Sequence, residues 1–267
     1  MGPDARKIRF EEDGYLVAKA LLSAEEVAAC EREIERLHRL AVELDARGDP
    51  AADRFQLEPF AGNAKRKGLP VLRKIEQTRE LSGVYRDLAA HPRLIRLVGS
   101  LLGPDLLLFR STLMLKPAYH GSSHGLHQDS AYWPMQPPAL VTVSIALTDA
   151  GPENGCIQVL PRSHRWGLQA WGRIARRQDE SLTDRSDVDL SASIDVSLKA
   201  GDAVLFHSLT VHGSGPNTSP HPRHTALYAY FPPTVRYVPG DRGPSEMTFA
   251  VAAGLAGRDS VTLTAET

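Results

Sequence analysis

Residues 126–129 read Leu-His-Gln-Asp, and residues 206–214 read Phe-His-Ser-Leu-Thr-Val-His-Gly-Ser. Side chains alternate between the two faces of an extended strand, so His127 and Asp129 are expected to point the same way and to share one metal ion. A third ligand must come from elsewhere, and His212 stands in the second stretch, which a folded sheet can place beside the first. Two imidazoles and one carboxylate on one face of a metal are typical of non-haem Fe(II) oxygenases. The pattern therefore predicts an iron site.

The second stretch contains another histidine, His207, which competes with His212 for the metal. The two lie five residues apart, so in a regular strand they face opposite sides and only one of them can bind. Spacing alone does not choose between them.

From Leu106 to Phe231 short apolar segments are separated by Gly, Pro and Asn clusters. The expected strands cover residues 106–116, 126–133, 139–149, 156–160, 194–198, 202–211 and 224–231. Regularly spaced short strands of this kind predict a closed or double-sheet β architecture.

The N-terminal part of the chain is expected to be mainly helical. Ser23 and Glu26 form a capping-box pattern in front of residues with helical periodicity, and further helices are expected over 79–102. The remaining expectations are an extended lead-in over 8–22, a long loop over 45–70, a short strand over 71–75, and a loosely held tail after Gly240.

The composition is that of a globular protein. A chain of 267 residues with 42% hydrophobic content can bury a substantial core. Its formal net charge of -1 gives no electrostatic reason to expect a nucleic-acid partner.

The sequence also bears on the compartment. Cys30 and Cys156 are too few for a disulfide framework. The first ten residues are charged and lack an apolar segment, and no apolar stretch of about 18 residues occurs. These features predict a cytoplasmic protein without a membrane partner.

A longer series of motifs surrounds the expected ligands. It consists of Lys116-Pro117, His127-Gln128-Asp129-Ser130-Ala131-Tyr132-Trp133, Asn154-Gly155-Cys156-Ile157-Gln158-Val159-Leu160-Pro161-Arg162-Ser163-His164, Gly201-Asp202, His212-Gly213-Ser214-Gly215-Pro216-Asn217 and Arg223. In this order and spacing, the series resembles the phytanoyl-CoA dioxygenase family of Fe(II)/2-oxoglutarate oxygenases. The resemblance covers about residues 8–235. It implies a jelly-roll core, a double-stranded β-helix, packed against N-terminal α-helices. It also implies Fe(II) as the cofactor, with 2-oxoglutarate as cosubstrate and O2 as the oxidant.

The resemblance also suggests roles for single residues. It favours His212 over His207 as the third ligand, because a Gly-Ser pair and Arg223 follow at the matching intervals. Arg223 is expected to bind the distal carboxylate of 2-oxoglutarate as a planar fork. Ser214 follows His212 at the two-residue period and is expected to face the same interior. Thr112 and Lys74 match further cosubstrate positions.

Residues near the ligands suggest a substrate pocket and a type of reaction. Tyr132, Trp133 and His124 are expected to line that pocket. Radical halogenases with this scaffold have a small residue at the position of Asp129. Because this chain has the carboxylate, hydroxylation or a related oxidation is favoured over halogenation.

The whole chain, 1–267, is expected to be a single oxygenase domain. Its expected parts are helical support with a lid loop over 1–103, the jelly-roll core over 104–235 with an insertion over 163–193, and a C-terminal tail over 236–267. Specificity is expected to lie in the segments 45–70 and 165–193.

The expected reaction is hydroxylation or oxidative tailoring of a small organic molecule such as a secondary-metabolite intermediate, with succinate and CO2 as co-products. Three alternatives stay open. They are an acyl-CoA or other anionic small substrate, a zinc hydrolase using the same ligands, and a jelly-roll binding module without catalysis.

Overall fold

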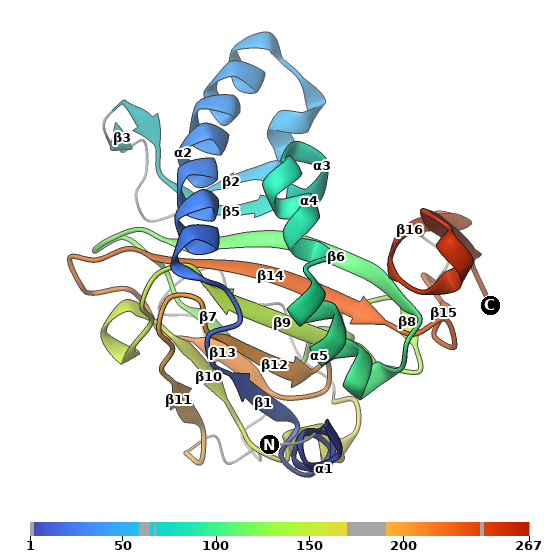
Figure 1. Cartoon of the computed structure of the whole chain (residues 1–267). Coiled ribbons are helices and arrows are strands. Elements are labelled where there is room, and N and C mark those ends of the chain that lie inside the picture. The colour runs from blue at the N-terminus through green and yellow to red at the C-terminus, as the bar shows by residue number, and fades with distance from the viewer. Residues whose placement is uncertain (1–2, 59–64, 67, 170–190, 241–242, 267) are drawn as a thin grey trace.

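The protein consists of two antiparallel β-sheets that face each other, with helices over the outer face of the larger one (Figure 1). Figure 1 shows the computed structural model, which describes residues 3–58, 65–66, 68–169, 191–240 and 243–266. This arrangement confirms the predicted jelly-roll core with N-terminal helices.

The larger sheet has nine strands. The order along it is β1 (Tyr15–Ala18), β12 (Ala203–His207), β9 (Val141–Ala146), β14 (Arg223–Phe231), β6 (Leu106–Lys116), β16 (Glu246–Ala253) and β17 (Ser260–Thr264). Beside this path, β5 (Leu72–Glu76) pairs with both β6 and β2 (Phe55–Leu57). The strand predicted at 71–75 is therefore confirmed as β5.

The smaller sheet has four strands in the order β11 (Ile194–Val196), β10 (Ile157–Val159), β13 (His212–Ser214) and β7 (His124–His127). Two short ribbons complete the strands: β8 (Met135–Gln136) with β15 (Arg236–Tyr237), and β3 (Lys65–Arg66) with β4 (Leu69–Pro70). Two of the four strands in the smaller sheet thus carry the predicted histidine ligands.

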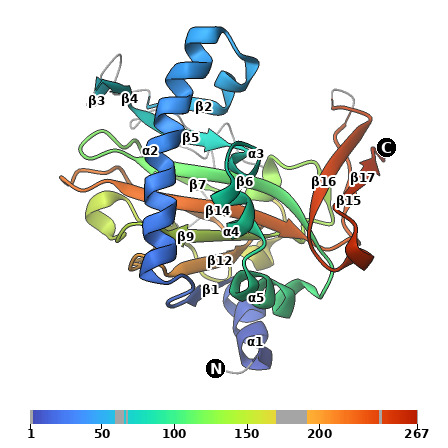
Figure 2. The same cartoon turned by 45° about the horizontal axis from the view of Figure 1, so that its top comes forward.

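Helices α2 (Ala24–Arg47), α3 (Thr78–Leu81), α4 (Gly83–Ala89) and α5 (Pro92–Leu102) lie on the outer side of the larger sheet (Figure 2). The capping box is present as predicted, since the Ser23 side chain accepts from the Glu26 N–H and the Glu26 carboxylate accepts from the Ser23 N–H. Ile34 and Leu37 of α2 are buried in the core between the helices and the sheet. The expected helices at 79–102 are therefore confirmed.

Strand alternation divides each long strand between two interiors. On β6, Leu113 and Leu115 pack under the helices, whereas Thr112 and Met114 face a cavity between the sheets. On β12, Leu205 belongs to the helix-covered core, and Phe206 points between the sheets. The larger sheet therefore supplies one face to the core and the other face to the cavity.

Two expectations about the N-terminal region need correction. Of the extended lead-in expected over 8–22, residues 8–13 belong to helix α1 (Pro3–Asp13), whereas residues 15–18 are extended as β1. Ion pairs at helical spacing, such as Arg9 with Asp13, accompany this helix, and Gly14 at a φ of +79° ends it. The segment 45–70 is not one long loop, because α2 continues to Arg47 and is followed by a 3-10 helix (Pro50–Arg54), β2 and β4.

The expectation of a loosely held tail after Gly240 is also wrong. Strands β16 and β17 form an antiparallel hairpin, and β16 pairs with β6. Much of this hairpin is exposed, so its sequence lacks the strong apolar alternation that would predict strands. The insertion expected over 163–193 lies mostly outside the described residues.

Candidate active site

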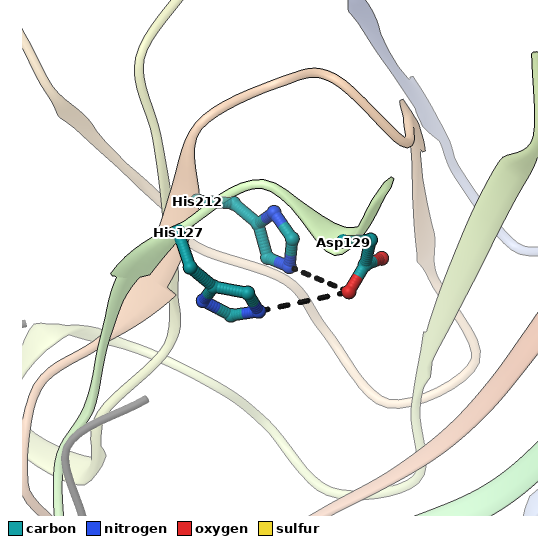
Figure 3. A group of neighbouring side chains, drawn as sticks. All are labelled: His127, Asp129 and His212. Atoms are coloured by element: carbon teal, nitrogen blue, oxygen red, sulfur yellow. Dashed lines mark ion pairs between the residues drawn. The ribbon is translucent and has the colours of Figure 1, made fainter. Parts of the chain in front are cut away.

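The structure brings together the three predicted metal ligands (Figure 3). The last residue of β7, His127, is the register partner of the first residue of β13, His212. Asp129 follows β7 at the start of a 3-10 turn (Asp129–Ala131). Its Oδ1 lies 3.6 Å from Nε2 of His127 and 3.8 Å from Nε2 of His212.

The donor set fits one metal ion. Ligand atoms that each lie about 2.1 Å from a metal are separated by about 3–4 Å, and the observed distances of 3.6 and 3.8 Å agree with that range. Two nitrogens and one carboxylate oxygen form one face of a coordination sphere, which suits Fe(II). Among the described residues, the His, Cys, Asp and Glu side chains close enough to hold one metal ion are those of His127, Asp129 and His212.

The local structure around the ligands differs from the two long strands that were expected. Strand β7 ends at His127 rather than continuing to residue 133, but Gln128 is still extended at φ −106° and ψ 129°. This extended residue keeps His127 and Asp129 on the same side. The second stretch is divided, since β12 ends at His207 in the larger sheet and β13 begins at His212 in the smaller one.

This division decides between the two candidate histidines. The ring of His207 lies beside Phe10 and His164, with centroids 6.4 and 5.7 Å apart. The ring of His212 lies 4.4 Å from that of His127 and packs at 4.2 Å against Phe206. His212, and not His207, therefore completes the group that could hold a metal ion.

Hydrogen bonds orient each ligand. Nδ1 of His127 is 2.8 Å from the Gly125 carbonyl, and Nδ1 of His212 is 2.9 Å from the Thr210 carbonyl. A carbonyl can only accept, so each Nδ1 carries the hydrogen and each Nε2 keeps its lone pair for a metal.

The carboxylate of Asp129 is held in the same way. The buried hydroxyl of Thr142 on β9 donates to Oδ2 of Asp129 at 2.8 Å. Oδ1 therefore remains for the metal.

The surroundings of His212 and Asp129 shift the pKa of each toward its metal-binding form. Burial, together with the neighbouring His127, lowers the pKa of His212 to about 4, so its imidazole is neutral at physiological pH. Burial alone would raise the pKa of Asp129, but the two imidazoles and the Thr142 hydroxyl outweigh it and hold the pKa at about 2. A neutral imidazole and an ionised carboxylate are the forms that bind metals.

His127, Asp129 and His212 line a cavity of about 260 Å³ between the two sheets, which we call the catalytic cavity. All the other residues predicted for the site line it: Arg223, Ser214, Thr112, Lys74, Trp133, Tyr132 and His124. They come from both sheets and from the turn after β7. The fold thus places them around one space, although they are spread over 150 positions of the chain (from 74 to 223).

Arg223 is a buried cation at the start of β14. Its Nε and Nη2 donate to the Gly155 carbonyl at 3.0 and 2.7 Å, and its Nη1 donates to the Thr225 hydroxyl at 2.8 Å. Each terminal nitrogen keeps one further N–H. Burial lowers the pKa of Arg223 to about 10, so it is still charged at neutral pH.

A second buried cation lies opposite Arg223 in the strand register. Lys116 is 4% exposed and donates to the carbonyls of Ser122 and Gly215. Burial and the nearby Arg223 lower the pKa of Lys116 well below its usual value. No carboxylate is ion-paired with either cation within the described part of the chain, so an anionic ligand would relieve their repulsion.

The other expected cosubstrate residues differ in how they are bonded. The hydroxyl of Thr112 is buried and has no hydrogen-bond partner among the described residues. An orphaned hydroxyl that faces a cavity suits a polar ligand. Ser214 is also buried and lines the same cavity. Lys74, by contrast, already forms an ion pair with Glu76.

Sequence reasoning missed several residues of this site. Arg110 and Met114 also line the catalytic cavity, and their two-residue spacing from Thr112 was a usable signal. The guanidinium of Arg110 lies 5.8 Å from the ring centroid of Trp133. Thr142 gave no signal in the sequence, because its role depends on a neighbouring strand.

Comparisons with known proteins agree with this geometry. The model of the family described as phytanoyl-CoA dioxygenase (PhyH) matches residues 10–225. This chain belongs to that family. An ectoine dioxygenase of Nocardia farcinica is 30% identical over 238 residues, which cover 83% of this chain and 75% of the relative.

Solved structures show the same fold. The non-heme monooxygenase ThoJ, in its apo form, superposes with a TM-score of 0.74 and 26% identity, covering 93% of this chain and 83% of its own. The epimerase SnoN in complex with Fe3+, alpha ketoglutarate and nogalamycin RO has a TM-score of 0.66 and 25% identity, covering 91% and 92% of the two chains.

The family and the His-Asp-His triad together identify a 2-oxoglutarate-dependent non-haem iron dioxygenase, with iron as its metal cofactor and 2-oxoglutarate as its cosubstrate. They decide against the zinc hydrolase and the non-catalytic binding module. None of the described helices combines the length and apolar character needed to span a bilayer.

Proposed function

We propose that this dioxygenase hydroxylates or oxidatively tailors a small organic molecule, a secondary-metabolite intermediate, while 2-oxoglutarate is converted to succinate and CO2. The observation that carries the proposal is the triad of His127, Asp129 and His212 at the wall of a cavity that also contains the charged fork of Arg223. Iron bound there supplies the chemistry that activates O2 for attack on a C–H bond.

In this proposal the protein side chains bind and orient 2-oxoglutarate. The two unused N–H groups of Arg223 bind its distal carboxylate in a bidentate manner, since planar forks match carboxylates. Thr112 and Ser214 donate hydroxyl hydrogens to the same ligand. Lys74 contributes positive charge at the cavity edge, reduced by its ion pair with Glu76.

The substrate occupies the part of the catalytic cavity bounded by Tyr132, Trp133 and His124. A volume of about 260 Å³ is near the lower end of ligand pockets, which favours a compact molecule over a polymer. The similarity to SnoN, whose structure contains nogalamycin RO, supports a small organic molecule of this kind as the substrate.

A second candidate is an acyl-CoA or another small substrate with an anionic group. Arg110 supports it, because this cation lines the catalytic cavity and has no ion pair among the described residues. Its stacking near Trp133 and Phe109 holds the guanidinium in place. An anionic group of the substrate would then bind beside the aromatic wall.

The first test is an anaerobic titration of the metal-free protein with Fe(II) and 2-oxoglutarate, followed by the visible charge-transfer band. We expect a band in the wild type, no band in His212→Ala, and a need for much more 2-oxoglutarate in Arg223→Ala. No band in the wild type despite confirmed metal binding would refute the proposed binding mode.

The second test separates the two substrate candidates. Small molecules are screened for stimulation of succinate formation, and each anionic compound is paired with its neutral methyl ester. If the substrate is anionic, the acid stimulates turnover more than the ester, and Arg110→Gln removes this preference. An equal response to both forms would reject the anionic candidate and leave the neutral one.

A further inference from the structure

A second cavity lies away from the iron site, between α1, β1 and α5. Its volume is about 800 Å³, and it shares no lining residue with the catalytic cavity. Its lining contains five cations and no acidic residue: Arg6 and Arg9 from α1, Lys19 just after β1, and Arg93 and Arg96 from α5. We call this space the basic cavity.

The carboxylates close to this cavity are already engaged. Asp13 lies 3.7 Å from Arg9 and 3.6 Å from Arg162. Asp202 pairs with Lys19 at 2.9 Å and also accepts from the backbone N–H groups of Ala20 and Lys199.

Three arginines of the basic cavity, Arg6, Arg93 and Arg96, form no ion pair within the described residues, and Arg93 approaches the Leu21 carbonyl at 3.5 Å. The pKa of Glu26 is lowered by a backbone hydrogen bond and in smaller part by Arg93, but Glu26 already pairs with His91 at 3.0 Å. A chain with a net charge of -1 has no general excess of cations, so this concentration is local.

The position of Arg93 is unfavourable for the helix itself. Arg93 lies in the first turn of α5, where the helix dipole is positive, and the first turn contains no acidic residue of its own; Arg96 follows in the second turn. Proteins break such local rules mainly at functional sites. A bound anion would supply that compensation, because it would interact with the arginines and with the helix terminus together.

The walls of the cavity add an apolar component. Leu16, Leu21 and Leu97 are buried and line it together with the cations. Apolar walls strengthen the electrostatic attraction in a concave site and can also pack against an organic moiety. Arginine forks match phosphoryl oxygens, and several cations together require a ligand with more than one negative charge.

From these observations we propose that the basic cavity binds a small organic diphosphate. The diphosphate lies between the arginines of α1 and those of α5, and the organic moiety packs on the leucine wall. This site is separate from the iron site and does not depend on the identity of the oxidised substrate.

The test is calorimetric titration of the full-length, Fe(II)-loaded protein with pyrophosphate and with ADP at two ionic strengths. We expect both probes to bind, ADP at least as tightly as pyrophosphate because of its organic part, and both more weakly at high salt. Arg93→Gln/Arg96→Gln is expected to weaken binding at least tenfold. Arg6→Gln, on the opposite wall, is expected to weaken it several-fold.

The matched control is Arg32→Gln/Arg39→Gln, which removes two exposed arginines from α2 and changes the net charge equally. It is expected to bind both probes like the wild type. The proposal is overturned if neither probe binds, if the control weakens binding as much as the α5 variant, or if ADP binds more weakly than pyrophosphate.

Discussion

The charged side chains of the catalytic cavity and those of the basic cavity differ in burial and in their bonding to the protein. In the first, His212, Asp129 and Arg223 are buried, and each holds at least one further hydrogen bond to the protein. In the second, Arg93 and Arg96 are exposed and form no ion pair among the described residues. Buried, bonded groups depend strongly on one another, whereas exposed charges are screened by water and salt. Changes should therefore have large effects in the first cavity and small effects on catalysis in the second.

The largest effect is expected for His212→Ala. Changes next to metal ligands already cost about 10–100-fold, so loss of a ligand should abolish Fe(II) binding and succinate formation. His207→Ala is the matched control, because His207 belongs to the same segment but faces α1. Turnover and iron content of both variants are measured together. Loss of activity in both, or in neither, would contradict the assignment of the ligand.

Arg223→Leu is expected to raise the KM for 2-oxoglutarate at least about 100-fold, since two charge-assisted hydrogen bonds of about 1.5–3 kcal/mol each are lost. Arg223→Lys keeps the positive charge but lacks the planar guanidinium, so its KM for 2-oxoglutarate should lie between those of the wild type and Arg223→Leu. Thermal melting checks the fold, because Arg223 also binds the Gly155 carbonyl. A lower kcat with an unchanged KM would speak against a role in cosubstrate binding.

Thr142→Val tests how far a neighbouring hydroxyl fixes the metal ligand. The substitution removes the hydrogen bond to Oδ2 of Asp129 and is expected to weaken Fe(II) affinity about tenfold. Thr142→Ser keeps the hydroxyl and should behave like the wild type. Equal affinities in all three proteins would show that packing alone orients the carboxylate.

The lowered pKa of His207 predicts that the stability of the protein depends moderately on pH. Burial, assisted by the nearby His164, lowers the pKa of His207 to about 4. The unfolded chain binds this proton more readily, with a pKa of about 6.5, so stability is complete above pH 6.5 and is lost as the pH falls toward 4. The loss at pH 5 amounts to about 2 kcal/mol.

The variant His207→Asn keeps an acceptor for the Leu209 N–H and should lose less stability on acidification. Melting temperatures at pH 7 and pH 5 measure this, with the exposed His120→Asn as the control. An identical acid response in His207→Asn and the wild type would refute the role of His207.

The smallest effect is expected for Arg93→Gln/Arg96→Gln on catalysis. Because the basic cavity shares no lining residue with the catalytic cavity, turnover without added phosphate compounds should stay within about twofold of the wild type. Initial rates of succinate formation measure it. A loss comparable to that of Thr142→Val would show that the two cavities are energetically coupled.

The sequence by itself determined the elements that depend on local chemistry. Short apolar segments between Gly, Pro and Asn clusters predicted β6, β9 and β12, and the Ser23 capping box predicted the start of α2. The pair His127 and Asp129 was readable because its spacing follows the strand period, which Gln128 preserves.

Only the tertiary structure decided the features that depend on contacts between distant segments. His212 becomes a ligand because the chain crosses from the larger to the smaller sheet after His207, which places it opposite His127. The bond from Thr142 to Asp129 depends on how β9 lies beside the turn after β7. The β16–β17 hairpin is held by pairing with β6, and the basic cavity forms where α1 meets α5. No local pattern encodes these contacts, because each depends on residues that meet only when the sheets and helices pack.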